Sequence, residues 1–145
     1  MNPAITIRML NSNDFSVFDR VVPDVFDNKI DPRWANEFLN DPRHHMVVAI
    51  ADEQVVGMAS AVHYIHPDKP PELWINEVGV APPYQRQGIA KQLLQALLAY
   101  GRSLGCREAW VGTDEDNTAA RHLYASVGGK EKRIVYVTFE LVPEV

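Results

Sequence analysis

The chain has 145 residues, of which 46% are hydrophobic and 23% are charged, with a formal net charge of −5. This profile predicts one globular domain over residues 1–145, and the acidic balance argues against a sequence-independent nucleic-acid site, which depends on clustered Lys and Arg. A single cysteine excludes an internal disulfide, and the lack of a basic leader or an 18-residue apolar run predicts a cytoplasmic protein that does not bind a membrane.

The N-terminal quarter predicts a short strand followed by two helices. Residues 5–8 have strand character, and the apolar residues between positions 15 and 26 recur close to helical spacing, with Pro23 expected to end or kink that helix. A capping aspartate before a proline predicts a second helix over residues 32–39. Two aromatic residues four positions apart are expected on the buried face of that helix, Trp34 and Phe38.

The middle of the chain predicts antiparallel strands. Two apolar runs within residues 46–64 are divided by an Asp-Glu-Gln turn, which is typical of a hairpin. A proline-containing loop follows, and residues 72–80 predict the next strand.

The remaining elements alternate between helix and strand. A strongly amphipathic helix begins near Ile89 and ends at Gly105, and residues 106–113, 118–127 and 134–141 predict a strand, a helix and a half-buried edge strand. We therefore expect an α/β (α+β) fold with a mixed, mostly antiparallel sheet of 6–7 strands flanked by about 4 helices.

The turn into the amphipathic helix is suited to binding an anion. The first turn of a helix has free N–H groups and the positive end of the helix dipole, and small residues there permit close approach of a diphosphate. Gly88 could also simply shape an ordinary turn. The spacing excludes a Walker loop and a Rossmann fingerprint. The residues of the candidate site are Gln85, Arg86, Gln87, Gly88, Ile89, Ala90 and Lys91.

Two motifs resemble the GNAT superfamily of N-acetyltransferases. Residues 85–90 read Gln-Arg-Gln-Gly-Ile-Ala and match the family pattern Q/R-x-x-G-x-G/A, and residues 117–128 resemble its N-x-x-A-x-x-x-Y-x-x-x-G helix. The resemblance implies a GNAT-like fold with acetyl-CoA as co-substrate and no metal. The chain departs from the family at Gly129, where phenylalanine is usual, so we expect looser packing between this helix and the next strand.

The resemblance also implies how the cofactor is held and how the leaving thiolate is protonated. Backbone groups of Val78 and Val80 in a bulged strand are expected to bind the pantetheine arm. Asn117 is expected to cap its helix and do nothing more, or to cap the helix and also contact the cofactor. Tyr124 is the candidate general acid, although its helical spacing is equally that of a core residue.

Acetyl transfer to an amine also needs a base, since the amine is mostly protonated at neutral pH. Glu77 directly precedes the bulged segment and is the first candidate for base and substrate binding, although an exposed strand carboxylate is the plain alternative. Glu72 and His63 are second candidates for the base and for contacting the substrate. His63 and His66 lack a third clustered ligand for zinc, and Cys106 has no paired base.

The acceptor is expected to be a primary amine of a small molecule. Residues 61–77 partially resemble the type I aminoglycoside 3-N-acetyltransferases, and a polycationic acceptor agrees with the acidic residues. Acetylation of a protein or peptide and a non-catalytic acetyl-CoA sensor remain alternatives. The regular alternation in residues 134–141 provides an edge for pairing between subunits, so we expect a homodimer.

Overall fold

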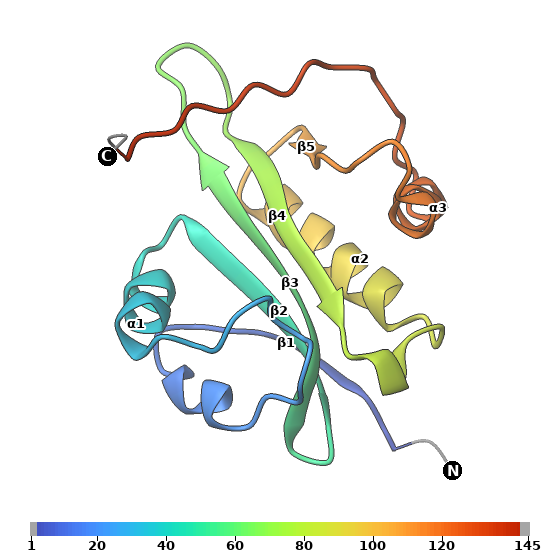
Figure 1. Ribbon diagram of the computed structural model, residues 1–145. Helices are drawn as coiled ribbons and strands as arrows, with labels where there is room; N and C mark the ends of the chain where they lie inside the picture. Colours follow the sequence, from blue (N-terminus) through green and yellow to red (C-terminus); the bar gives the residue numbers. More distant parts are fainter. Residues whose placement is uncertain (1–2, 143–145) are drawn as a thin grey trace.

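Five strands form one mixed sheet in the order β1-β2-β3-β4-β5 (Figure 1). The structure is a computed structural model that describes residues 3–142. Neighbouring strands are antiparallel except β4 and β5, which are parallel. The strands are β1 (Thr6–Met9), β2 (His44–Ala51), β3 (Gln54–Tyr64), β4 (Glu72–Val80) and β5 (Ala109–Trp110).

Helices cover both faces of this sheet. The helix α2 (Ile89–Ser103) packs on one face and buries its leucines against inward-facing residues of β2, β3 and β4. A 3-10 helix (Phe15–Asp19) and α1 (Pro32–Asn40) lie over the other face (Figure 1). A second 3-10 helix (Pro82–Tyr84) precedes α2, and α3 (Thr118–Ser126) lies beyond β5. Among residues 3–142, no helix is both long and apolar enough to span a bilayer.

Several expected elements are confirmed, and the residues that the sequence indicated as their cause have the expected conformations and contacts. The side chain of Asp31 accepts a hydrogen bond from the Arg33 N–H and caps α1, and Pro32 opens that helix. Asp52 and Glu53 both have positive φ, as a two-residue hairpin turn between β2 and β3 requires. The predicted strand over residues 72–80 is β4.

The N-terminal helical prediction is wrong over most of residues 15–26. Only the 3-10 helix forms, because Val22 bonds through its N–H to the Val55 carbonyl and Asp24 has a positive φ. Both features are incompatible with a continuing helix. Trp34 is 70% exposed, so the expected buried face of α1 is formed instead around Ala35.

The C-terminal strand predictions are also corrected. Of residues 106–113, only Ala109 and Trp110 pair in the sheet, because β5 leaves β4 after Trp110. Residues 134–141 form no strand and remain exposed, because they pair with no strand of the described chain. The described residues therefore contain five strands and three α-helices, fewer than the 6–7 strands and about 4 helices that we expected.

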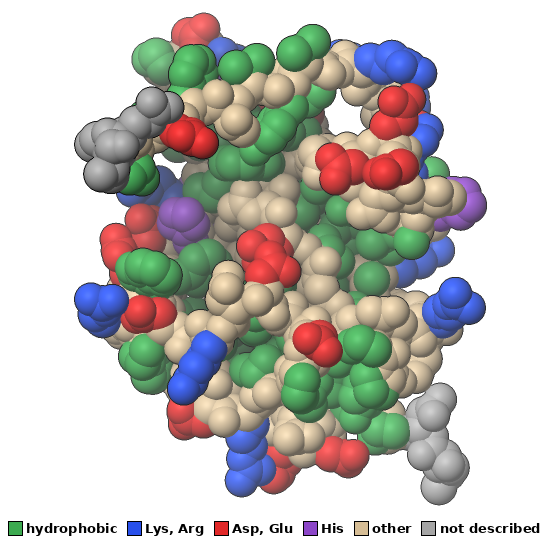
Figure 2. All heavy atoms as spheres, viewed as in Figure 1, with side chains coloured by type: hydrophobic (Ala, Val, Ile, Leu, Met, Phe, Trp, Pro, Cys, Tyr) green, Lys and Arg blue, Asp and Glu red, His purple; other side chains and the backbone are tan. Residues whose placement is uncertain are grey.

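Figure 2 shows hydrophobic side chains on the rim where the segment after α3 crosses the molecule. Residues 134–141, which the period-2 pattern had suggested as a half-buried strand, have exposed apolar side chains at positions 134–137, 139 and 141. We call residues 134–141 the C-terminal segment.

Candidate functional site

A β-bulge and a divergence of strands open the sheet at the middle of β4. Ser60 pairs with Glu77 and Ala61 pairs with Ile75, so Asn76 is an extra residue without a partner on β3. On the other side, β4 pairs with β5 only at residues 73–74. Beyond Trp74, therefore, the outer edge of β4 is open.

The backbone groups of Val78 and Val80 face this open edge. The Ala81 N–H donates to the Val56 carbonyl, so residue 81 points toward β3. Because successive residues of a strand point their backbone groups to alternate sides, Val78 and Val80 point away from β3. The side-chain amide of Gln85 donates to the Val80 carbonyl at 2.9 Å, which agrees with this orientation. An extended ligand could pair with β4 here as an added strand.

The turn before α2 forms a row of free N–H groups. Arg86 and Gly88 both have left-handed φ values, of 62° and 78°, and Gly88 is the N-cap of α2. In the described chain, no backbone acceptor bonds the N–H groups of residues 86–91. Successive N–H groups of this kind, at the positive end of a 15-residue helix, are suited to binding an anion.

The side chains around this row differ in their roles. Arg86 and Lys91 are exposed cations, while Ile89 is buried in the core and anchors the start of α2. Gln87 reaches back to the Pro83 carbonyl at 3.4 Å. Space around Gly88 is open, so its left-handed backbone, rather than a lack of room, is what favours glycine there.

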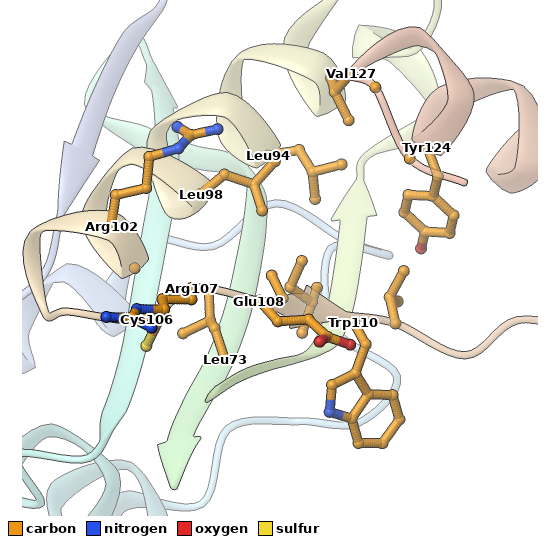
Figure 3. A pocket seen from close by; sticks show the side chains of 16 residues that line it. Leu73, Leu94, Leu98, Arg102, Cys106, Arg107, Glu108, Trp110, Tyr124 and Val127 are labelled. Atoms are coloured by element: carbon orange, nitrogen blue, oxygen red, sulfur yellow. The ribbon is translucent and has the colours of Figure 1, made fainter. Parts of the chain in front are cut away.

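The helix α3 lies on the side of β5 that is away from β4 (Figure 1). Asn117 is at its start and Tyr124 is near its end. Asn117 caps α3 by accepting a hydrogen bond from the Ala120 N–H at 3.1 Å, as one of its two expected roles required. Tyr124 is half-buried, and burial raises the pKa of its phenol. Its ring reaches from α3 with the hydroxyl toward the strand that carries Trp110 (Figure 3). The phenol thus remains protonated at neutral pH and keeps a proton to donate.

A cavity of about 260 Å³ lies between α2, β5 and α3 (Figure 3). Gly129 is at its edge, where its N–H bonds the Tyr124 carbonyl at 2.9 Å and a Cβ would lie 2.8 Å from the same oxygen. A phenylalanine therefore does not fit this turn as it stands, and no ring fills the space. The apolar part of the lining consists of Leu73, Ile75, Leu94, Leu98, Val111 and Val127.

Glu77 lies on the other face of the sheet, in a cavity of about 300 Å³ below α1. Its exposed side chain shares this lining with two further acids before α1, Asp27 and Asp31, with Lys29, and with the aromatic residues Trp34 and Phe38. Sequence reasoning missed Asp27 and Trp34 as lining residues, because no spacing rule places the loop before α1 against β4.

Glu72 lies on the same face as Glu77 but is already engaged. His66 Nε2 lies 2.9 Å from Glu72 Oε2, and hydrogen bonds from His66 and then Tyr64 lower the pKa of this carboxylate. A lowered pKa makes Glu72 a weaker base. Near it, the Trp74 and Trp110 rings stack at 5.2 Å, and Trp110 donates to the Tyr64 hydroxyl at 2.7 Å. This exposed aromatic pair was not predicted.

His63 lies on the opposite face from both carboxylates. It is three residues beyond Ser60, the partner of Glu77, and alternation turns its side chain toward the face that α2 covers. There its Nδ1 lies 2.7 Å from Nε2 of His45. The structure therefore does not bring His63 together with Glu77. Within residues 3–142, no group of three or more potential ligands is arranged to hold a metal ion.

Known proteins are similar to this chain in sequence. A sequence model of the acetyltransferase (GNAT) family matches residues 10–128. Aminoglycoside N(6′)-acetyltransferase type 1 of Salmonella typhimurium is 30% identical over 94 residues, a match that covers 61% of this chain and 65% of that relative. N-alpha-acetyltransferase RimI of Mycobacterium tuberculosis is 34% identical over 104 residues, covering 72% of this chain and 63% of that protein. The Salmonella relative is named for the 6′ position, not for the 3-N position of the partial resemblance.

Solved structures have the same fold. An aminoglycoside acetyltransferase from a soil metagenomic sample superposes with a TM-score of 0.85 at 24% identity, covering 95% of this chain and 97% of that one. The aminoglycoside N-acetyltransferase AAC(6′)-Iy in complex with CoA gives 0.76 at 23% identity, covering 98% of each chain.

Proposed function

Because the chain belongs to the acetyltransferase (GNAT) family, we propose that it transfers an acetyl group from acetyl-CoA to a primary amine of a small molecule. The observation that carries this proposal is the opening between β4 and β5, which leads to the free N–H groups at the start of α2. The opening suits an extended thioester arm whose diphosphate sits on the helix N-terminus.

The proposed cofactor contacts follow from this arrangement. The N–H groups of residues 86–91 bind the diphosphate, and the exposed Arg86 and Lys91 add charge-assisted contacts. The side chains of Gln85 and Gln87 stabilise the turn by hydrogen bonds to backbone carbonyls, and the buried Ile89 fixes the start of α2. The small residues Gly88 and Ala90 let the diphosphate approach the backbone closely. The Val78 and Val80 backbone pairs with the pantetheine arm, and Asn117 supports α3 beside it.

In the proposed reaction, the amine nitrogen attacks the thioester carbonyl carbon directly. Glu77 accepts the proton that the amine must lose, and a backbone N–H near Val78 stabilises the developing oxyanion. The new C–N bond forms as the C–S bond breaks. Tyr124 gives its proton to the departing thiolate and recovers one from solvent, which agrees with the raised pKa of its phenol.

The surroundings of Glu77 support a cationic acceptor. Asp27 and Asp31 share its cavity, so three acids there outnumber the one cation, Lys29. The stacked Trp74 and Trp110 rings on the same face suit the apolar face of a ring or an ammonium group. An aminoglycoside-like polyamine has both features. A peptide N-terminus is the second candidate, since RimI of M. tuberculosis is among the relatives. A sensor that binds acetyl-CoA without turnover is the third.

A panel assay separates these candidates. Thiol release from acetyl-CoA would be measured with polyamines, aminoglycosides, amino acids and peptides, alongside calorimetric binding of acetyl-CoA. We expect turnover on aminoglycosides or polyamines. Turnover on peptides alone would support the second candidate, and tight binding without turnover would support the sensor.

The catalytic assignment is tested by Glu77→Gln and Tyr124→Phe. Each is expected to lower kcat/KM by roughly 10²-fold or more, because each removes one proton-transfer group. The matched controls are Glu53→Gln in the exposed hairpin turn and Tyr100→Phe on α2, which are expected to leave kcat/KM unchanged. If both test variants stay within twofold of the parent, the proposed mechanism is wrong.

We also propose that residues 1–145 act as one N-acetyltransferase domain in the cytoplasm, and that the chain forms a homodimer. The exposed C-terminal segment supports the homodimer. Sedimentation at high protein concentration tests it, since a monomer there would exclude the dimer.

A further inference from the structure

The chain between the first 3-10 helix and α1 crosses the face of β4 that carries Glu77. We call residues 23–30 the crossing segment. The Val25 carbonyl lies directly over Gly79, where an added Cβ would be 2.5 Å from the carbonyl oxygen. Contacts of a Cβ shorter than 3.0 Å are essentially not found in proteins. Gly79 has no left-handed φ, so the close approach of this segment is what requires a glycine there.

Apolar contacts hold the crossing segment in place. Among the described residues, it makes no backbone–backbone hydrogen bond. Val25 is 3% exposed and belongs to the core of this face, and the Phe26 ring meets Phe18 edge to face at 6.1 Å between ring centroids. A segment without backbone hydrogen bonds shifts at low cost, so its height above the sheet depends on these contacts and on Gly79.

The same segment forms a wall of the proposed acceptor cavity. Together with Glu77, residues 26–30 line the cavity of about 300 Å³ below α1. The same five residues also line a second cavity of about 510 Å³, whose lining does not include Glu77. The crossing segment is therefore a boundary that the two cavities share. Its height above β4 sets how much space an acceptor bound at Glu77 can use.

We propose that Gly79 is a specificity-determining residue, which acts by seating the crossing segment against β4 beside Glu77. In this seat the wall contacts slim acceptors and excludes bulky ones. A side chain at position 79 lifts the wall and admits bulkier acceptors. This role rests on the proposed function, because it requires that the acceptor amine reach Glu77 from this face.

The cofactor edge of β4 is separate from this contact. Because the Ala81 N–H bonds to β3, the backbone groups of Gly79, two residues earlier, also point toward β3. Those of Val78 and Val80 point to the open edge instead. A Cβ on Gly79 would be directed at Val25, on the face that the N-terminal helices cover. A substitution there should therefore alter the acceptor preference and leave acetyl-CoA binding intact.

The test compares two acceptors within each variant. Neamine has two rings, and neomycin carries the same two rings and two more; putrescine and spermine are the equivalent pair for polyamine turnover. The ratio of the two kcat/KM values does not depend on the fraction of folded enzyme. We expect Gly79→Ala to raise the ratio of bulky to slim acceptor about tenfold or more. Calorimetry should give an acetyl-CoA Kd within about twofold of the parent's.

Gly101→Ala is the matched control, because its Cβ would also crowd β4, at 2.8 Å from the Leu73 side chain, but from the face that α2 covers. It should leave the acceptor ratio unchanged. Phe26→Ala removes the contact with Phe18 without altering β4, and should raise the ratio as Gly79→Ala does. It provides the test if Gly79→Ala does not fold.

The outcomes separate this role from the proposed function. A parent protein that acetylates neither pair of amines would overturn both. Turnover by the parent with an unchanged ratio in Gly79→Ala, even if both rates fall, would overturn only the role of Gly79. An unchanged ratio in Phe26→Ala would do the same. Equal ratio changes in Gly79→Ala and Gly101→Ala, or a weakened affinity for acetyl-CoA, would mean that Gly79 does not act through the crossing segment.

Discussion

The two carboxylates of β4, Glu72 and Glu77, have different surroundings, and these give them different acid–base properties. Glu72 is held by His66 and Tyr64 and has a lowered pKa, whereas Glu77 is exposed in a cavity with other acids. The two carboxylates lie five residues apart on one strand and one face. Their neighbours, rather than their spacing, support the proposal that Glu77 and not Glu72 is the base.

His45 makes the stability of the protein dependent on pH. It is buried, and burial followed by repulsion from His63 lowers its pKa from 6.5 to about 4. The folded state thus favours neutral His45, so its contribution is complete above pH 6.5 and is lost as the pH falls toward 4. We expect a loss of up to about 3 kcal/mol over this window, measured by urea unfolding.

His45→Gln should flatten this pH dependence, because the substitution removes the buried titrating group. The control is His122→Gln on the exposed side of α3, which should retain the full slope. A parent protein whose free energy of unfolding is constant between pH 6.5 and 4 would contradict the prediction.

At the scale of elements, the start of α2 depends on the backbone of Gly88. An alanine there has space but must keep a φ of 78°, which costs about 1–2 kcal/mol. We expect Gly88→Ala to lower the unfolding free energy by that amount and to weaken CoA binding, measured by thermal unfolding and calorimetry. Gly112→Ala is the control, because Gly112 also has open space but no left-handed φ.

The helix α2 also supplies much of the hydrophobic core. Two neighbouring leucines on it, Leu97 and Leu98, should contribute differently to the free energy of unfolding. Leu97 is fully buried against the sheet, whereas Leu98 is only partly buried and lines the open cavity. Leu97→Ala is expected to cost about 2–5 kcal/mol in denaturant unfolding, because it leaves a cavity in packed surroundings. Leu98→Ala should cost clearly less at low protein concentration. Equal losses would mean that the cavity beside Leu98 is filled within one chain.

At the scale of the molecule, the two ends of the sheet differ in how far their strands pair. β1 to β4 pair along long registers and bury the core between α2 and the N-terminal helices. Beyond β5, α3 and the C-terminal segment retain exposed apolar surface. This asymmetry places the proposed cofactor opening at the last strand pairing and the proposed subunit contact immediately beyond it.

The sequence by itself determined the features whose cause is local. Asp31 and Pro32 begin α1, Asn117 caps α3, and the pattern of leucines defines α2, since caps and periodicity act within a few residues. The glycine-containing turn at residues 85–91 and the helix at residues 117–128 were sufficient to indicate the family before any geometry was known.

Tertiary structure decided what depends on distant partners. Period-2 alternation in residues 134–141 predicts a strand, but a strand also needs an edge, and the chain's own ion pairs at Glu131 and Arg133 lead this segment away from β5. The face on which His63 lies, and the loop that lines the cavity of Glu77, likewise depend on register and on loop packing. Local patterns specify what an element tends to form, whereas pairing across the sheet determines which elements form and what their side chains meet.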